Sequence, residues 1–445
     1  MPATRSLRHP ARLLPLAVLA IIMLGTGLLM LPAARPGDAG APLLTALFTA
    51  TSATCITGLT VVDTATYWSP FGKAVILALF QVGGFGIMSL ATLIGLFVTR
   101  RLGLSTRLLA QAETKVLELG EVRRILIRVA VIMVSFELAL AVVLAARFAL
   151  GYDYPPGKAV WHGTFHAVSA FNNAGFSLYP DSLMRFVNDV WICLAVGFGV
   201  IAGGLGFPVL LELIRQRGRV ARWSMHTKLI VFGTAVLLVA GTSLVLGLEW
   251  SNPRTLGPLS VPDKLLAGFF QGMTPRSAGF HTVDYAGMTV ETWAVTTALM
   301  FIGGGSASTA GGIKVTTFFL LGFVILAEVR GDQDVAVFDR RAPAPAQRQA
   351  LSIALLGVGV IGFGTLLMLS LTGQPLDRAL FEVTSAATTT GLSTGITPEL
   401  PAAGRVLLII LMFVGRVGPA VAAAALALRS RRLLYRLPEG RPIIG

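Results

Sequence analysis

The chain has 445 residues, of which 54% are hydrophobic and 13% are charged, about half the charged fraction of an ordinary globular protein. A chain this apolar cannot keep enough polar surface to remain dispersed in water, so the composition excludes a series of soluble domains. The net charge of +14 is concentrated in a few loops and does not indicate nucleic acid as a partner, and the two cysteines, Cys55 and Cys193, do not indicate a disulfide framework. We therefore expect an all-α integral membrane protein.

Eight apolar runs are long enough to cross about 30 Å of hydrocarbon, for which a helix needs roughly 20 residues. In chain order they are 13–31, 74–98, 129–146, 190–211, 229–248, 292–327, 349–372 and 406–428. The first run follows three arginines, so a cleaved signal peptide is an alternative reading of it. We favour a membrane span, because the run exceeds a usual signal core and its loss would leave the repeat described below incomplete.

Basic residues gather in alternate segments between these runs. The N-terminus and residues 99–128, 215–228, 329–348 and 429–445 carry 24 of the 36 Lys and Arg residues, and these segments share one side if all eight runs cross. The positive-inside rule places that side in the cytoplasm. We therefore expect a multi-pass plasma (inner) membrane protein with both termini cytoplasmic, and an amphipathic stretch at 103–124 along the cytoplasmic membrane surface.

Each successive pair of runs encloses a short outer segment, and the four segments fit one template. They contain the tracts TSATCITGL, VSAFNNAGF, GMTPRSAGF and TSAATTTGL, whose glycines are Gly58, Gly175, Gly279 and Gly391. A phenylalanine stands ten residues before each glycine, at Phe48, Phe165, Phe269 and Phe381, and the glycines are 117, 104 and 112 residues apart. This internal repeat predicts four units at 1–105, 106–222, 223–342 and 343–430, followed by a basic tail at 431–445.

The template predicts a short helix that enters the membrane partway and ends in non-helical backbone, which is tolerated at that depth only if it is buried or lines water. Four such segments around one axis would present rings of carbonyl oxygens to a cation, as a selectivity filter does, with the partly negative helix ends toward it. Close helix packing is the alternative role for the glycines, but it leaves the shared spacing unexplained. The expected cation ligands are Ile56, Thr57, Gly58, Asn173, Ala174, Gly175, Ser277, Ala278, Gly279, Thr389, Thr390 and Gly391.

The sixth run, 292–327, would be roughly 54 Å long as one helix, which is too long for the membrane. Its middle reads GGGSASTAGG, and each glycine costs about 1 kcal/mol in a helix, so we expect an intramembrane loop below the filter. A phosphate-binding loop is the rival reading, but Ile313 separates the last glycine from Lys314. The residues of interest in this loop are Gly303, Gly304, Gly305, Ser306, Ser308, Thr309, Gly311 and Gly312, with Lys314 directly after it and Arg416 in the eighth run as nearby cations.

Charged residues inside the runs are costly unless they are paired or hydrated. The best partners for Arg416 in the eighth run are carbonyls of the broken loop, with snorkelling to the interface as the alternative. Lys314 has two open roles, a latch of the gate or an anchor at a helix end. Arg276, within the third tract, is expected to point behind the filter toward acids such as Glu382, and Glu137 is expected to pair between helices, with proton coupling as the alternative.

On these residues the chain resembles the Trk/Ktr/HKT superfamily of potassium transporters, and the tracts match that family's four filter signatures over nearly the whole chain. Without two additional N-terminal spans it is more similar to the membrane subunit of a Ktr-type system than to a typical Trk subunit. The resemblance implies four covalently linked helix–pore helix–helix repeats around a pseudo-fourfold pore. It also implies a homodimer, a cytoplasmic nucleotide-binding regulatory ring of the Ktr or Trk type, and sodium as an activator. By the same resemblance, potassium is the ion expected at the four tracts, and the loop at 303–312 with Lys314 and Arg416 is the expected gate.

We therefore expect potassium uptake through a channel-like pore and no enzymatic activity, because the spans contain no paired carboxylates, nucleophile or metal-ligand set. With one glycine in each tract, we expect fewer ordered ion sites and moderate selectivity over sodium. The alternative is a cation symporter that works by alternating access. Such carriers commonly contain inverted repeats, whereas these four share one orientation.

Overall fold

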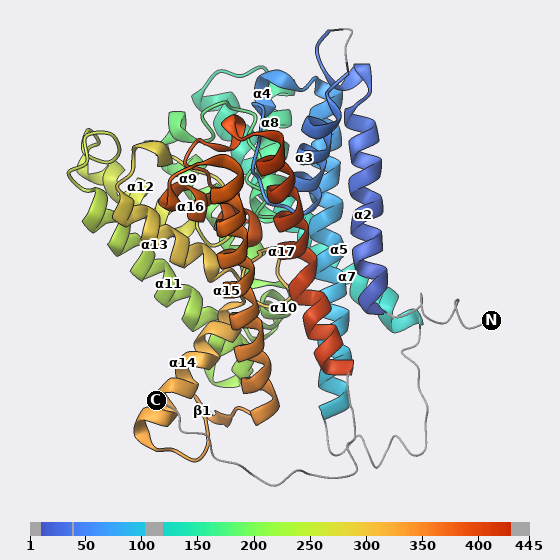
Figure 1. Cartoon of the computed structure of the whole chain (residues 1–445), viewed down its shortest axis with the longest axis vertical. Coiled ribbons are helices and arrows are strands. Elements are labelled where there is room, and N and C mark those ends of the chain that lie inside the picture. The colour runs from blue at the N-terminus through green and yellow to red at the C-terminus, as the bar shows by residue number, and fades with distance from the viewer. Residues whose placement is uncertain (1–9, 38–39, 103–118, 429–445) are drawn as a thin grey trace.

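The computed structural model describes residues 10–37, 40–102 and 119–428, and the chain is mostly helical within them (Figure 1). The expected all-α fold is therefore confirmed. Residues 103–118 of the expected surface stretch and the whole basic tail at 431–445 lie outside the described residues, while 119–124 belong to the next long helix.

The first two expected repeats each contain a long helix, then a short helix, then either one long helix or two shorter helices. The first is built from α2 (Pro10–Leu29), α3 (Leu43–Thr54) and α5 (Pro70–Leu102), with η1 (Pro32–Ala34) and α4 (Thr64–Tyr67) in its connections. The second is built from α7 (Leu119–Gly151), α8 (Pro156–Phe171), α9 (Val190–Leu205) and α10 (Phe207–Gln216), with η2 (Met184–Phe186) and η3 (Val220–Arg222) in its connections.

The last two repeats follow the same order. The third contains α11 (Met225–Glu249), α12 (Val261–Met273), η4 (Tyr285–Gly287), α13 (Val290–Phe301) and α14 (Val315–Arg330). A two-stranded antiparallel hairpin of β1 (Ala336–Val337) and β2 (Arg340–Arg341) follows it, and Lys228 of α11 binds Asp339 in the turn of the hairpin at 3.1 Å. The fourth contains α15 (Ala344–Thr372), α16 (Leu376–Ala387), η5 (Thr397–Glu399) and α17 (Ala402–Leu428).

The short helices α3, α8, α12 and α16 begin in the same way and lie inside the fold. Each has a proline within its first turn or at its N-cap, where the missing N–H costs nothing: Pro42, Pro156, Pro262 and Pro375. Their second halves are almost fully buried. The repeats close into a ring, because α17 of the last repeat packs against α2, α3 and α5 of the first.

The first run is part of this ring, which disfavours its reading as a removable signal. Val18 and Ile22 of α2 are buried in one apolar cluster with the pore-side face of α17, and Leu29 is fully buried in a second cluster with α3 and α5. Figure 1 shows α2 standing beside α5 along its whole length.

Three described helices are long and apolar enough to cross a bilayer unbroken, namely Arg123–Gly151 within α7, α11 and α15, and α9 with α10 makes a bent fourth. The expected spans in α2, α5 and α17 have shorter apolar parts among the residues whose side chains are described. The span at 292–327 is divided between α13 and α14, as expected from its glycine run.

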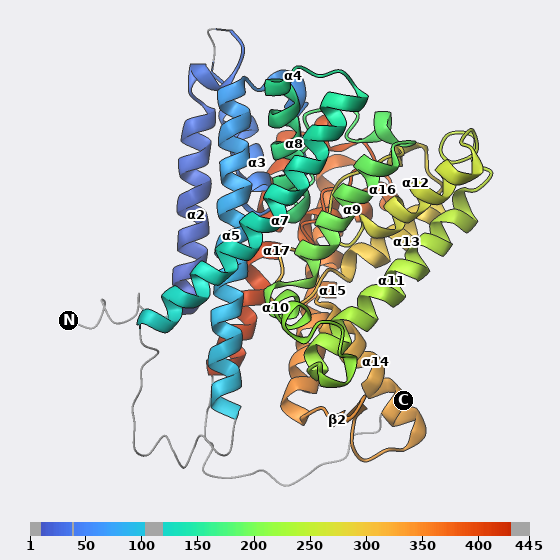
Figure 2. The same cartoon turned by 180° about the vertical axis from the view of Figure 1, so that it is seen from behind.

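The run at 190–211 is not one continuous span, which corrects the sequence prediction. α9 ends at Leu205, α10 begins at Phe207, and the two helices meet at an angle of 102° (Figure 2). Gly206 has a φ of +91°, a conformation open mainly to glycine, and its Cα lies against the carbonyl of Ser306, where a Cβ would approach the oxygen to 2.7 Å. Pro208, in the first turn of α10, cannot continue the helix from α9, so the bend has a local cause, and the contact with the distant loop explains why residue 206 is a glycine.

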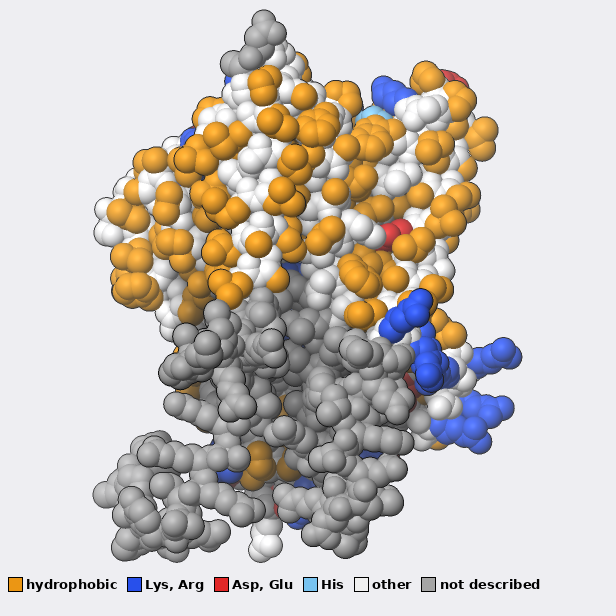
Figure 3. Space-filling view, turned by 90° about the vertical axis from the view of Figure 1, so that its right-hand side faces the viewer, with side chains coloured by type: hydrophobic (Ala, Val, Ile, Leu, Met, Phe, Trp, Pro, Cys, Tyr) orange, Lys and Arg blue, Asp and Glu red, His pale blue; other side chains and the backbone are white. Residues whose placement is uncertain are grey.

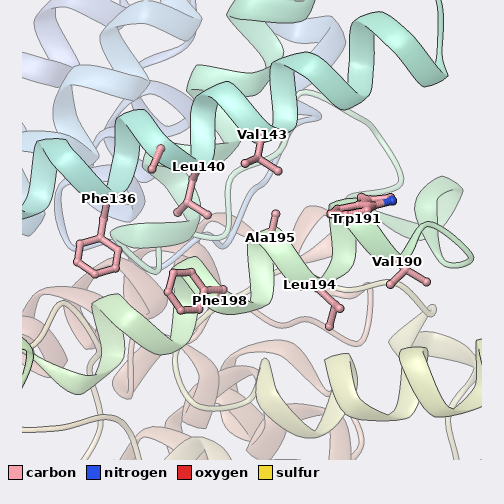
Figure 4. Close-up of a pocket in the computed structure, with 9 residues that line it drawn as sticks. Phe136, Leu140, Val143, Val190, Trp191, Leu194, Ala195 and Phe198 are labelled. Carbon is pink, nitrogen blue, oxygen red and sulfur yellow. The ribbon is translucent and has the colours of Figure 1, made fainter. Parts of the chain in front are cut away.

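The outside of the helix ring is apolar. α7 and α9 border a groove of about 410 Å³ whose lining is hydrophobic (Figure 4). Side chains along it are strongly exposed, including Val143 at 43%, Phe198 at 57% and Trp191 at 67%. Surfaces of this kind are unfavourable in water, and we expect this face to contact lipid.

Candidate functional site

The four glycine-containing tracts surround one axis. A Cβ placed on Gly58 would lie 2.6 Å from the Ala174 carbonyl oxygen, one on Gly175 would lie 3.0 Å from that of Ala278, and one on Gly279 would lie 2.8 Å from that of Thr390. A Cβ on Gly391 would overlap the carbonyl oxygen of Thr57. Because Thr57 belongs to the first tract, the fourth tract contacts the first. The structure therefore brings the four tracts into one closed ring of glycines and carbonyl oxygens.

The backbone of all four tracts has the same conformation. Each glycine has a positive φ, and so does the residue two positions before it: Ile56, Asn173, Ser277 and Thr389, with φ values of 56°, 57°, 72° and 49°. Non-glycine residues in this region cost of order 1–3 kcal/mol each and persist only where the surroundings hold them. The four tracts therefore repeat one local pattern, a left-handed residue, one intervening residue and a left-handed glycine.

A hydroxyl at the end of each short helix supports the tract that follows. Ser52 and Ser385 accept hydrogen bonds from the N–H groups of Gly58 and Gly391, at 3.1 and 3.0 Å. Ser169 donates to the carbonyl of Phe176 at 2.8 Å, and Thr274 donates to that of Phe280. These bonds hold the strained backbone on the side away from the axis.

The third tract is one residue shorter than the template predicted. The fully buried phenylalanine of α12 is Phe270, not Phe269, and it lies four residues before Thr274 just as Phe48 lies four before Ser52. The template, which placed Phe269 at the phenylalanine position of the third tract, was therefore wrong by one residue. Burial decides the register, because two adjacent aromatic residues fit the spacing about equally well.

Three polar side chains that the sequence did not assign to the site contact the chain after the second, third and fourth tracts. Glu382 on α16 accepts hydrogen bonds from Ser393 (2.5 Å), Thr397 (2.7 Å) and the N–H of Thr394 (2.9 Å). His166 on α8 and Gln271 on α12 occupy the same place, next to the buried phenylalanine, and contact Ser177 and Thr282 at 3.1 and 3.3 Å. A search for polar residues directly after the phenylalanines would have found all three.

Arg276 points away from the axis, as expected, but its partner is not an acid. Its guanidinium donates to the carbonyl and hydroxyl oxygens of Thr234 on α11, at 3.3 and 3.1 Å, while Glu382 is already occupied by hydroxyls and an N–H. The prediction that it reaches toward Glu382 was therefore wrong.

Glu137 joins two helices to the second tract. Its carboxylate accepts from Gln81 of α5 at 2.9 Å and from Asn172 at 3.0 Å, and Asn172 is the residue directly before Asn173. Only 6% of Glu137 is exposed. The expected interhelical pairing is present, and it reaches the side chain of the residue directly before Asn173 in the second tract.

A cavity of about 240 Å³ opens on one side of the glycine ring. All four glycines line it, together with residues that follow each tract, among them Asp63 and Asp284. Asp63 also caps α4 by accepting from the N–H of Ala65 at 3.0 Å, and Asp284 accepts from that of Ala286 at 2.9 Å. The entrance to the ring therefore carries fixed carboxylates that favour cations.

The glycine-rich segment forms a non-helical loop on the other side of the ring. Its two ends pair, with Gly303 N–H donating to Ile313 (2.9 Å) and Ile313 N–H donating to Phe301 (3.0 Å). Inside the loop, Ser308 donates to Gly305 at 2.6 Å, and Ser306 shares a hydrogen bond with Thr316 at 3.0 Å. The predicted break lies where it was expected, and the named residues Gly304, Gly311 and Gly312 belong to it.

The loop touches three of the four tracts from below. Ser277 accepts from Gly311 N–H at 2.9 Å and donates to the carbonyl of Thr389 at 2.8 Å. The Thr309 hydroxyl donates to Phe171, the last residue of α8, at 3.2 Å. A Cβ on Gly311 would overlap the Thr388 carbonyl and the Thr389 hydroxyl, so the loop lies in direct contact with the base of the ring.

Two cations hold consecutive carbonyls of this loop. Arg416 on α17 donates to Thr309 at 2.5 Å, and Lys314 donates to Ala310 at 2.6 Å. Only 5% of Arg416 is exposed, and no acid pairs with it among the described residues. The side chain therefore faces the loop and not the interface, as its expected role requires, and Lys314 also contacts the loop.

Comparison with known proteins gives consistent matches. A profile of the TrkH family, described as a cation transport protein, matches residues 16–432. The chain is 40% identical to the Ktr system potassium uptake protein B of Bacillus subtilis, over 98% of this chain and 97% of that protein. It is 33% identical to the potassium/sodium uptake protein NtpJ of Enterococcus hirae, over 98% and 97% respectively.

The fold also matches a solved structure. The crystal structure of the potassium transporter TrkH from Vibrio parahaemolyticus superposes with a TM-score of 0.69 at 19% identity, covering 91% of this chain and 83% of that one. At this identity the likeness concerns the fold. It agrees with the arrangement of helices around the four tracts.

Proposed function

The chain belongs to the TrkH family of cation transport proteins, and we propose that it takes up potassium ions through the ring of four tracts, with the glycine-rich loop as its gate. The observation that carries this proposal is the closed sequence of contacts among Gly58, Gly175, Gly279 and Gly391 and the carbonyls before them. Carbonyl oxygens arranged in this way can replace the hydration shell of a monovalent cation. The relatives named above as potassium uptake proteins support the choice of ion.

The path we propose runs from the cavity beside Asp63 and Asp284, through the ring, to the loop below it. An inside-negative potential drives a cation inward, and each elementary charge gains about 2.3 kcal/mol per 100 mV. In the described conformation the loop lies against the base of the ring through Gly311 and Thr309, so conduction requires it to move. Arg416 and Lys314 act as latches of that loop.

Selectivity over sodium is expected to be moderate. Each tract supplies one glycine, and the third tract is one residue shorter than the others, so the carbonyls form fewer complete rings than in a filter with fourfold symmetry. The name of the Enterococcus relative, a potassium/sodium uptake protein, supports permeation of both ions. Sodium as an activator remains part of the proposal.

The assembly we propose is a homodimer with a cytoplasmic nucleotide-binding regulatory ring. A relative named as one component of a "Ktr system" supports partner subunits, and the basic loops support cytoplasmic termini. The regulatory ring would contact the end of the molecule that carries the hairpin and α10.

Rubidium influx into proteoliposomes tests the proposal. Gly391→Asp removes a positive-φ glycine and places a carboxylate over the Thr57 carbonyl, so flux should be lost or lose its preference for rubidium over sodium. Gly373→Asp is a matched control, since Gly373 also has a positive φ but has open space around it at the end of α15. Unchanged selectivity in Gly391→Asp refutes the filter, and obligatory one-for-one exchange supports the alternating-access symporter instead.

A further inference from the structure

We propose that the end of α10 and the turn after it bind anionic phospholipid headgroups, and that this binding favours the closed position of the gating loop. The binding surface, here called the arginine patch, consists of Arg215, Arg217, Arg219 and Arg222. All four side chains are exposed. The effect on the gating loop rests on the proposed function, whereas the binding of phospholipid headgroups does not.

The arginine patch carries positive charge that no described acid neutralises. The nearby carboxylate, Glu212, is occupied by the N–H and hydroxyl of Ser224 at 2.6 and 2.7 Å and by Thr227 at 2.5 Å. Within the described part of the chain, none of the ion pairs involves an arginine of the patch. Four arginines within eight residues repel one another, and an external anion relieves that repulsion.

The backbone turns sharply within the arginine patch. Arg217 ends α10 with a φ of +42°, and Gly218 continues the turn with a φ of +79°. Basic residues are favourable at the C-terminal end of a helix, which is the partly negative end. The turn therefore presents the four arginines on one exposed segment.

Apolar side chains between the arginines indicate a membrane as the source of the anion. Ile214 and Val220 are each 55% exposed, and they alternate with the charged residues along the turn. Exposed aliphatic residues interleaved with arginines are typical of a segment that lies in the headgroup layer. On the face shown in Figure 3, most Lys and Arg side chains gather at the lower border of the hydrophobic surface, which is the level of such a layer.

Anchored to the core, α10 connects the arginine patch to the gating loop. Phe207 and Leu210 of α10 are buried against Val129 and Met133 of α7. At the start of α10, Phe207 N–H donates to the carbonyl of Ala307 in the loop at 3.2 Å. Just before it, the carbonyls of Gly203 and Gly204 accept from Thr309 at 3.3 Å and Gly305 at 2.7 Å.

These contacts give the direction of the effect. The bonds from α9 and α10 to the loop belong to the conformation in which the loop lies against the base of the ring. A ligand that holds α10 in this place stabilises that conformation, because a ligand shifts an equilibrium toward the state that it binds better. Anionic lipid is therefore expected to lower ion flux.

The test compares wild type, the triple variant Arg217→Gln/Arg219→Gln/Arg222→Gln, and the control variant Arg340→Gln/Arg341→Gln. The control removes exposed arginines of the hairpin that make no contact with α10 among the described residues. Each full chain is reconstituted in phosphatidylcholine with and without phosphatidylglycerol. Retained phosphatidylglycerol is measured by native mass spectrometry, and rubidium influx is measured in the same membranes.

We expect the triple variant to lose affinity for phosphatidylglycerol by about fivefold for each arginine removed, while the control retains it. Phosphatidylglycerol should lower rubidium influx in wild type and control and leave it unchanged in the triple variant. Equal retention of the lipid by all three proteins overturns the binding site. Lost retention with an unaltered lipid response overturns the coupling to the loop.

Two further outcomes are distinguishable. If the arginine patch binds a protein partner instead, all three proteins will retain phosphatidylglycerol equally, and only the triple variant will fail to co-purify that partner. This outcome overturns the inference. If wild type shows no rubidium influx in any membrane while retention still depends on the arginine patch, the proposed function fails and the lipid site stands.

Discussion

Replacing Arg416 by alanine tests the latch most directly. The guanidinium donates to Thr309 at 2.5 Å, is 5% exposed, and has no acid partner among the described residues, so its main polar contact is the loop. A hydrogen bond to a charged group contributes about 1.5–3 kcal/mol. Losing it should shift the equilibrium between closed and open loop by roughly 10- to 100-fold toward the open state. The same change removes a positive charge near the path of the cation.

The assay is initial rubidium influx at equal amounts of reconstituted protein. The expected rise is smaller than the full equilibrium shift, because Lys314 still holds Ala310 and Ser277 still holds Gly311. Arg416→Lys separates the two contributions: it keeps the charge but loses the planar donor group, so an intermediate flux indicates that the hydrogen bond matters beyond the charge.

Arg405→Ala is the matched control, because Arg405 lies on the same helix and also donates to carbonyls, those of Leu400 and Pro398, both at 2.9 Å. The carbonyls of Leu400 and Pro398 follow the fourth tract in the sequence, and neither belongs to the glycine-rich loop. If Arg416→Ala conducts no faster than Arg405→Ala, Arg416 is not a latch and the gate must be held by other contacts.

Two other predictions concern the filter and its entrance. Glu137→Ala should lower the preference for rubidium over sodium, because Asn172 loses an acceptor beside the second tract, whereas Glu137→Gln should largely retain that preference. The ratio of rubidium to sodium influx measures the preference. Equal ratios in the two variants contradict a role of Glu137 in supporting the second tract. Replacing Asp63 and Asp284 together by asparagine should lower rubidium influx at low ionic strength and much less at high ionic strength. The reason is that added salt screens the attraction of exposed carboxylates for cations. A loss of influx that is independent of salt contradicts this role of the two carboxylates.

The tracts and the broken span could be predicted because their causes are local. A positive φ at Gly58 and its three counterparts favours glycine, and that preference recurs at similar spacings in the sequence. The run at 292–327 was too long for one helix and carried a dense group of glycines. In both cases a short stretch of residues contains the reason for its own conformation.

The parts that were missed depend on contacts between distant segments. The contact of Gly206 with Ser306 and Ala307, about 100 residues later, could not be predicted, although Pro208 was a local sign of a break within the run at 190–211. Thr234 was an unexpected partner for Arg276, because a hydroxyl and a carbonyl leave no charge pattern in the sequence. The register of the third tract depends on which of two phenylalanines is buried.

Because all four quarters of the ring belong to one polypeptide, each quarter can change without the others. Glu382, His166 and Gln271 perform equivalent tasks with different chemistry, which a pore assembled from identical subunits could not accommodate. A single codon change therefore alters one wall of the passage instead of four. Graded adjustment of ion preference, by small steps on one side at a time, is open to a chain built in this way.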